Sequence, residues 1–304
     1  MSSNRPAEDS AATDSSTLLD SAAIEGRLDG TRLLAPLLTS DVPALTDQLE
    51  TAKLLAGSTD ASLYITNPVR LPEQISPELH SETGSGADVE LLNWAVEQAS
   101  TPSNQVDGGV VYSRRIVTDV LQTISTNDID TVVLPGTSPR SLLRGDVTER
   151  IAVHADCDVV VVNGKPGIES VPSILLPVAG GPHSELAADL ARRIATNSDA
   201  WIDVLHAVPE NAPDPRREQA ETYVETAAQR IARPDTTSTR ILEADDPTAA
   251  IVDQSRYYPV TVIGAPTKGR LRRLIFGSTN RTIRSDAKSV VLSAWNHDTE
   301  RSLD

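Results

Sequence analysis

The sequence has few aromatic residues, a single cysteine and no cluster of histidines, and each shortage narrows what the protein can be. Aromatic residues make up only 3% of the 304, so the core has to be built from Val, Leu, Ile and Ala. Cys157 is the only cysteine, which excludes an intrachain disulfide and indicates a reducing compartment. The five histidines show no metal-ligand spacing, so we predict no metal site.

Long apolar runs are also missing. No stretch approaches the roughly 20 apolar residues that a membrane span needs. The N-terminal residues contain no apolar signal segment. We therefore expect a soluble, cytoplasmic protein without membrane insertion, and its length is sufficient for two ordinary domains.

Lysine is scarce in a chain that is strongly acidic. Asp and Glu outnumber Lys and Arg by 43 to 27, the formal net charge is −16, and only four of the bases are lysine. Such a surface is typical of adaptation to high salt, because screening removes most of the self-repulsion. We expect a salt-loving source such as a haloarchaeon; the alternative is an ordinary acidic cytosolic protein. The overall charge argues against nucleic acid as a partner, since binding needs a broad basic footprint.

Two similar halves follow an acidic N-terminal tail. Residues 1–29 are rich in Ser, Ala, Asp and Glu and are predicted to be disordered. Strand and helix patterns alternate over residues 30–164, and the order begins again over 171–297 after the Gly- and Pro-bearing segment 163–172. Alternating strands and helices predict an α/β fold with two tandem, Rossmann-like domains, each an open five-stranded parallel sheet with helices on both faces.

The expected elements follow from apolar periodicity and turn residues. In the first half we expect strands at 32–38, 61–66, 109–113, 131–134 and 159–162, helices at 42–56, 87–99, 116–125 and 145–154, and a surface loop at 68–85. In the second half we expect strands at 174–178, 201–208, 239–243, 260–263 and 290–292, and helices at 184–196, at 216–232, from 246 with Asp246 as its cap, and from 277.

One segment near the C-terminus is basic. Between Gly264 and Lys288 there are seven bases against one acid, Asp286. Gly277 is followed by Ser278 and Thr279, a typical helix start with a capping hydroxyl. Because such a start offers free N–H groups and a partial positive charge, the segment predicts a site for an anion, most often a phosphate.

This segment resembles the last third of a universal stress protein domain. The family's nucleotide-binding members carry Gly, two residues, Gly, nine residues, then Gly-Ser or Gly-Thr, and Gly264 and Gly277-Ser278 stand at the matching spacing. Thr267 departs from the pattern at the second glycine, and Gly269 follows two residues later. Further matches are SILLPVAGGPHSELAADLA, VLHAV, DDPTAAIVDQS, VIGAPTKGRLRRLIFGS and, in the first half, ADCDVVVVN. The resemblance covers residues 31–296 and implies two tandem domains of this family.

The resemblance also implies where a ligand would bind and how the halves would join. In an open parallel sheet, ligands sit beyond the carboxyl ends of the strands where strand order reverses. Ala179 stands where the family's nucleotide binders often carry an aspartate, and Arg270 and Arg272 are expected to bind phosphates in partial compensation. The final strands of the family often pair between domains, so we predict that Val159–Val162 pairs with Val290–Leu292 in an intramolecular pseudo-dimer. The candidate ligand-binding residues are Val178, Ala179, Gly180, Val208, Gly264, Gly269, Arg270, Gly277, Ser278 and Thr279.

The first half carries a degenerate version of this site. Gly136 and Gly145 are too closely spaced, and Asp146 replaces the Ser or Thr at the helix start, where a carboxylate would repel phosphate. Cys157 and His206 are interpreted as a packed hydrophobe and a hydrogen-bonded core histidine, and Trp201 and Trp295 as packing residues. His183 and Ser184 are adjacent and lack a third orienting group, so we expect no catalytic residues.

Two functions remain open on the sequence alone. The first is a stress-response regulatory protein whose second domain binds ATP, AMP or another phosphate-bearing anion and signals through an unknown protein partner. The second is a ligand-free module for dimerisation and partner contact, which Thr267 and Ala179 favour. A nucleotide hydrolase ranks below both because no positioned base is evident, and whether two chains form a homodimer is left open.

Overall fold

The computed structural model describes residues 31–57, 61–72, 86–136, 147–163, 167–265 and 278–297, with the backbone alone for 278–281. The first half (residues 31–163) and the second half (167–297) each alternate strand and helix. The strands are β1 (Arg32–Pro36), β2 (Ser62–Arg70), β3 (Gln105–Ser113), β4 (Thr131–Pro135), β5 (Asp158–Asn163), β6 (Ser173–Pro177), β7 (Trp201–Val208), β8 (Thr237–Glu243), β9 (Val260–Gly264) and β10 (Val290–Trp295).

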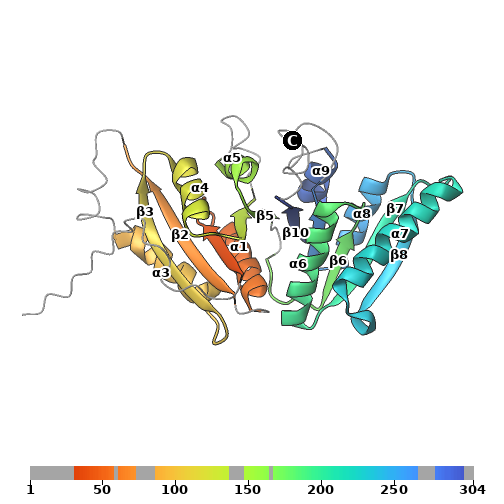
Figure 1. Cartoon of the computed structure of the whole chain (residues 1–304), viewed down its shortest axis with the longest axis horizontal. Helices are drawn as coiled ribbons and strands as arrows, with labels where there is room; N and C mark the ends of the chain where they lie inside the picture. The colour runs from red at the N-terminus through yellow and green to blue at the C-terminus, as the bar shows by residue number, and fades with distance from the viewer. Residues whose placement is uncertain are drawn as a thin grey trace, which may run out of the picture.

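All ten strands form one sheet, in the order β3-β2-β1-β4-β5-β10-β9-β6-β7-β8 (Figure 1). Within each half every neighbouring pair is parallel, and only β5 and β10 run antiparallel where the halves meet. The predicted α/β fold with two five-stranded parallel sheets is therefore confirmed. The halves are related as two copies placed edge to edge.

The predicted pairing of the final strands is also confirmed. Leu292 lies opposite Val162 and Trp295 opposite Val159 in the antiparallel ladder between β10 and β5. These strands are rich in β-branched residues and β10 is buried along its whole length, as expected for strands covered on both faces. The junction is thus a continuation of the sheet and not a contact between two separate surfaces.

Helices cover both faces of the sheet. They are α1 (Val42–Ala56), α3 (Gly86–Ala99), α4 (Ile116–Thr126), α5 (Val147–His154), α6 (Pro182–Ser198), α7 (Asp214–Ile231), α8 (Pro247–Ser255) and α9 (Ser278–Asp286), and a 3₁₀ turn, η2 (Pro234–Thr236), precedes β8. On one face α1, α3, α6 and α7 share one apolar cluster that crosses the junction. On the other face α4 and α5 cover the first half and α8 and α9 the second. None of the described helices is long and apolar enough to cross a membrane.

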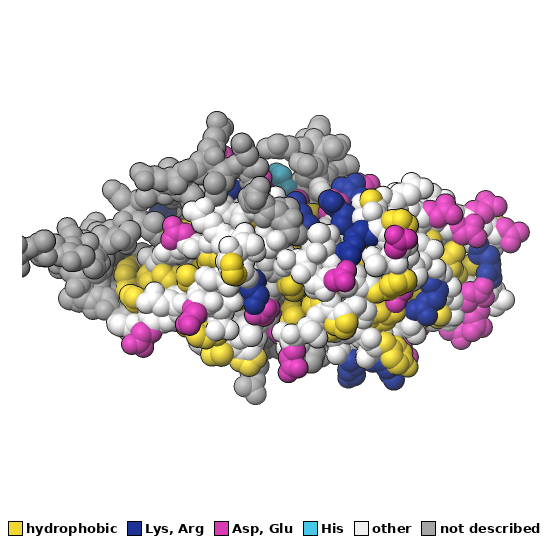
Figure 2. Space-filling view, turned by 90° about the horizontal axis from the view of Figure 1, so that it is seen from below, with side chains coloured by type: hydrophobic (Ala, Val, Ile, Leu, Met, Phe, Trp, Pro, Cys, Tyr) yellow, Lys and Arg dark blue, Asp and Glu magenta, His cyan; other side chains and the backbone are white. Residues whose placement is uncertain are grey.

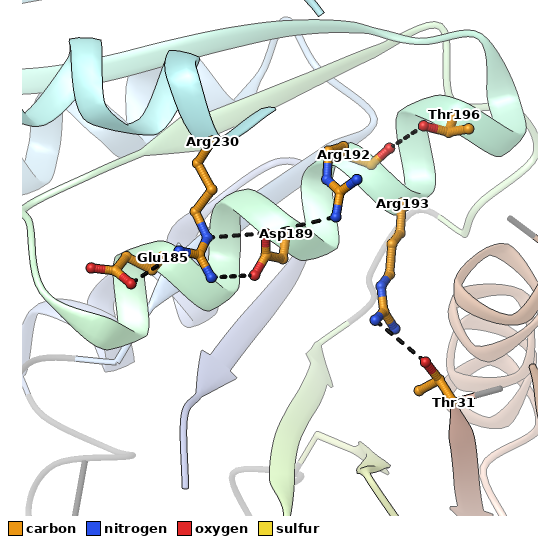
Figure 3. Close-up of polar contacts among 7 residues, drawn as sticks. All are labelled: Thr31, Glu185, Asp189, Arg192, Arg193, Thr196 and Arg230. Carbon is orange, nitrogen blue, oxygen red and sulfur yellow. Dashed lines mark hydrogen bonds and ion pairs between the residues drawn. The ribbon is translucent and has the colours of Figure 1, made fainter. Parts of the chain in front are cut away.

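Polar contacts fasten α6 to its neighbours (Figure 3). The Arg230 guanidinium of α7 donates to both carboxylate oxygens of Asp189, at 3.0 and 2.7 Å, and to Glu185 at 3.1 Å. Arg193 reaches across the junction and donates to the Thr31 hydroxyl at 3.4 Å. These groups are half-exposed, so they contribute little stability compared with the apolar layer beneath them.

The start of α8 follows the sequence pattern. Asp246 precedes Pro247 and its Oδ1 accepts hydrogen bonds from the amides of Thr248 and Ala249, at 2.9 and 3.1 Å. This satisfies two of the free N–H groups at the helix start, and Pro247 occupies a position where no N–H is needed. The predicted cap is confirmed.

Two predicted boundaries in the first half are wrong by four residues each. β2 continues to Arg70, through residues expected in a surface loop, and Pro68 pairs with Val111 of β3. β1, the other neighbour of β2, ends opposite Thr66. Beyond Thr66 the edge of β2 that faces β1 has no strand to bond, so a proline, which lacks an N–H, is tolerated at position 68. β3 begins at Gln105, four residues before the expected start, because an edge strand needs no continuous apolar run.

Candidate functional site

Each half has a point where the strand order reverses. In the second half β6 lies between β7 and β9, and its ladder with β9 ends at the pair Leu175–Thr261. In the first half β1 lies between β2 and β4, and the corresponding ladder ends at Leu34–Val132. Beyond those pairs the strands separate, and the gap at the carboxyl ends is where ligands bind in open α/β sheets. We call these gaps the first and the second crevice.

A tight turn after β6 forms one side of the second crevice. The Ala179 amide donates to the Ser184 hydroxyl at 3.2 Å, which joins the turn to α6. Gly180 and Gly181 both have positive φ values, 75° and 81°. A Cβ atom at Gly180 would lie 2.3 Å from the Tyr223 ring of α7, so only glycine fits beneath that ring.

A histidine and a tyrosine stand together behind this turn. His206 of β7 places Nδ1 2.6 Å from the Val178 carbonyl oxygen. Because a carbonyl can only accept, Nδ1 carries the hydrogen and Nε2 is left as an acceptor in the neutral ring. The ring lies 5.5 Å from that of Tyr223, tilted by 59°. His206 is hydrogen-bonded as predicted, but both side chains are only half-buried.

The end of β9 touches the start of α6. A Cβ atom at Gly264 would lie 2.6 Å from the carbonyl carbon of His183 and 2.7 Å from the Ser184 nitrogen. The absence of a side chain at Gly264 therefore permits the close approach of two backbones. The near neighbours are protein backbone, so this contact fixes α6 against the end of β9.

His183 and Ser184 have separate partners. The His183 ring is 3% exposed and stacks on Trp295, with ring centres 4.7 Å apart. Its Nδ1 accepts the Asn296 amide at 3.0 Å, and burial lowers the pKa of the imidazole. The Ser184 hydroxyl accepts from Ala179, and among the described residues no hydrogen bond joins it to the His183 ring, so the two side chains do not form a nucleophile–base pair in this structure.

The other candidate residues are buried, are described by their backbone alone, or lie outside the described residues. Val178 is 4% exposed, and Val208 is fully buried in a small cluster with Ala212 and Ala220. Ser278 and Thr279 open α9, as the predicted helix start requires, but their side chains are outside the description. The remaining candidates and the first-half loop lie outside the described residues, namely Gly269, Arg270, Arg272, Gly277, Gly145 and Asp146.

The remaining single residues behave in different ways. Cys157 is buried, and burial together with Asp158 raises the pKa of its thiol to about 12, as fits a packed, unreactive side chain. Trp295 is a packing residue as predicted, whereas Trp201 is 43% exposed at the start of β7, so that prediction was wrong for it. Among the described residues no group of three His, Cys, Asp or Glu side chains could hold a metal ion.

Comparison with known proteins identifies the family of this chain. The model of the universal stress protein family matches residues 39–163 and again 171–293, which is most of the chain. The chain belongs to the universal stress protein family. Its two matched segments make it a tandem member, as the sequence predicts.

Relatives of this universal stress protein are distant in sequence. A universal stress protein of Mycobacterium tuberculosis is 24% identical over 260 residues, covering 75% of this chain and 86% of its own. A second one from the same species is 26% identical over 188 residues, covering 56% and 63%. The crystal structure of a universal stress protein from Archaeoglobus fulgidus aligns with a TM-score of 0.62 at 12% identity, covering 88% of this chain and 97% of its own. At 12% identity this similarity shows a shared fold alone.

Proposed function

We propose that this universal stress protein is a stress-response regulatory protein whose second crevice binds an adenine nucleotide, ATP or AMP, or another phosphate-bearing anion. The observation that carries the proposal is the close approach of backbone at Gly264, opposite the turn at Gly180. It joins the end of β9 to the start of α6, and the Ala179–Ser184 hydrogen bond joins the turn after β6 to the same helix, where the strand order reverses. Family membership supports the stress-response role.

Two further features support an anionic ligand. The helix α9 begins at Ser278, and a helix that follows a parallel strand starts at the carboxyl edge of the sheet, so its free N–H groups face that edge. The segment before it is rich in Arg and Lys in a chain of net charge −16. His206 and Tyr223 add half-buried rings beside the turn, against which a base can stack.

A second candidate function is a ligand-free module that acts through protein partners. It is favoured by Ala179, which leaves no carboxylate after β6, and whose amide is already bonded to Ser184. In that case the fold serves to hold the two halves edge to edge and to present their outer surfaces. The unknown partner and a homodimer of tandem chains belong to this proposal as much as to the first.

Calorimetric titration of the full chain with ATP and with AMP, at molar KCl, tests the choice. The expected result is a saturable heat with one nucleotide per chain, lost in Gly277→Asp because a carboxylate then stands at the helix start. The matched control is Gly86→Asp, which places the same charge at the first residue of α3, where nothing lies within 4 Å of the new Cβ. Absence of heat in the unmodified chain would favour the second candidate.

A further inference from the structure

The helices α1 and α6 occupy equivalent places in the two halves. Both follow the first strand of their half and pack on each other across the junction. Their buried positions recur in the same order and spacing. Leu45, Asp47, Gln48, Leu49, Thr51, Ala52, Leu55 and Ala56 in α1 match Ser184, Leu186, Ala187, Ala188, Leu190, Ala191, Ile194 and Ala195 in α6. Gln48 is therefore the counterpart of Ala187.

The Gln48 side chain lies in the first crevice. Its Nε2 donates to the Pro36 carbonyl oxygen of β1 at 3.0 Å and to the Val133 carbonyl oxygen of β4 at 2.8 Å. Both acceptors follow the last register pair between these strands, Leu34–Val132. The amide thus bridges the two strands at the point where they begin to separate, and the residue is 0% exposed.

This arrangement does more than fill space in the core. Within the described part of the chain, Gln48 Oε1 is buried and accepts no hydrogen bond. A buried acceptor left in that state opposes folding. The second half fills the same position with Ala187, which is also 0% exposed and has no side-chain polar atom. An apolar residue is therefore compatible with this position, and the amide adds a bridge that packing alone does not need.

We propose that Gln48 closes the first crevice to ligand and that Ala187 leaves the second one without such a bridge, so that this helix position, together with the loop residue Asp146, decides which half binds. The inference rests on the proposed nucleotide function and adds to it the residue that selects the half. It differs from the loop argument based on Asp146, because Gln48 acts between the strands and Asp146 would act through charge.

The first test introduces the bridge into the second half. Ala187→Gln is expected to weaken ATP binding by about tenfold or more, measured by calorimetry on the full chain at molar KCl, with an unchanged far-ultraviolet circular dichroism spectrum. Thr51→Ala is the control, because Thr51 is an equally buried polar residue of α1 whose hydroxyl donates to the Asp47 carbonyl oxygen one turn earlier in its own helix. A folded Ala187→Gln variant with unaltered affinity would overturn the inference.

The second test removes the bridge from the first half. It can be carried out even if the Ala187→Gln variant does not fold. Asp146→Ser is used as the background, so that charge at the loop no longer repels phosphate. Adding Gln48→Ala is expected to raise the stoichiometry from one to two ATP per chain. An equal stoichiometry in both variants would overturn the inference.

The same pair of variants separates the two proposals. If the unmodified chain binds no ATP, the proposed function of the second half fails. In that event a change from no ATP to one, on adding Gln48→Ala to Asp146→Ser, still supports the role of Gln48. No binding by either variant then overturns this inference as well.

Discussion

At Gly264 the chain has no room for a side chain. The nearest atoms to an added Cβ are the carbonyl carbon and oxygen of His183 and the nitrogen of Ser184, at 2.6–2.7 Å, and all three are backbone. Gly264→Ala should therefore lower stability by about 1–3 kcal/mol, measured by urea unfolding at constant salt. Gly86→Ala is the control, because nothing lies within 4 Å there, and it should be neutral or slightly stabilising. Equal midpoints for the two variants would show that α6 can move away from β9.

Asp47 is a buried carboxylate beside the segment that joins the two halves. It is 2% exposed, and its Oδ1 accepts the Ile168 amide at 3.1 Å. Burial raises the pKa of the carboxyl, the bond from Ile168 opposes that shift, and Glu50 adds to it. An ionised Asp47 therefore costs stability, since the charged form is better solvated in the unfolded chain.

Asp47→Asn should remove this cost and keep the acceptor for Ile168. The gain, on the order of 1 kcal/mol, should be complete at neutral pH, where Asp47 is ionised in both states. It should shrink as the pH falls through the raised native pKa and vanish below the unfolded value near 3.8. Thermal unfolding of both proteins from neutral pH to about pH 3.5 checks this, and a gain that is constant or grows toward acid would contradict it.

The last strand of the chain, β10, carries a side chain into the other half. Trp295 is 7% exposed and belongs to the apolar cluster formed by α4, α5 and strands of the first half, including Ile151 and Val159. Trp295→Ala should cost about 3–5 kcal/mol. The control Trp201→Ala should cost less than about 1 kcal/mol, because Trp201 is 43% exposed and its indole N–H donates to Asp203 in its own strand.

The location of faster hydrogen exchange in the Trp295→Ala variant distinguishes a contact between the halves from packing within one half. Hydrogen exchange in the Trp295→Ala variant should accelerate in α5 and β5 of the first half as well as in β10, since β10 and β5 pair directly. Faster exchange confined to the second half would mean that Trp295 does not couple the two halves.

Helices and strands with a regular apolar pattern could be predicted from the sequence. Contacts between distant elements could not, except for the pairing of β5 with β10, which the family resemblance implied. The apolar spacing of α1 predicts its bounds, Val42–Ala56, and the β-branched runs predict β5 and β9. The bridge that Gln48 makes was missed, because its acceptor Val133 is far away in sequence and no local pattern marks a polar group that bridges strands. For His206 a hydrogen bond was predicted, but its partner, the Val178 carbonyl oxygen, was not. Pro68 in β2 was missed for the same reason, since the end of β1 decides whether proline is tolerated.

At the scale of the whole molecule, the antiparallel junction gives one sheet with two reversal points. Each half keeps its own strand order, and the crevices lie on either side of the junction between β5 and β10. The apolar layer under α1 and α6 continues from one half to the other. A single sheet and a shared core therefore join the two halves into one structural unit.

Charge repulsion acts over the same scale. Figure 2 shows Asp and Glu side chains scattered over the face seen from below, with a dense group at the end of the molecule formed by α7 and β8. On α7 the exposed residues Glu218, Glu221 and Glu225 follow one another at helical neighbour spacing, where like charges oppose helix formation. The net charge of −16 adds repulsion over longer distances.

Stability should therefore rise with salt. The screening length falls from about 10 Å at 0.1 M to about 3 Å at 1 M, so the unfolding temperature should increase steadily over that range of KCl. Replacing Glu218, Glu221 and Glu225 by Gln should raise the unfolding temperature most at 0.1 M and least at 1 M, and so flatten the dependence. If KCl stabilised both proteins equally, ion exclusion or hydration would be the cause, because those effects do not require the carboxylates of α7.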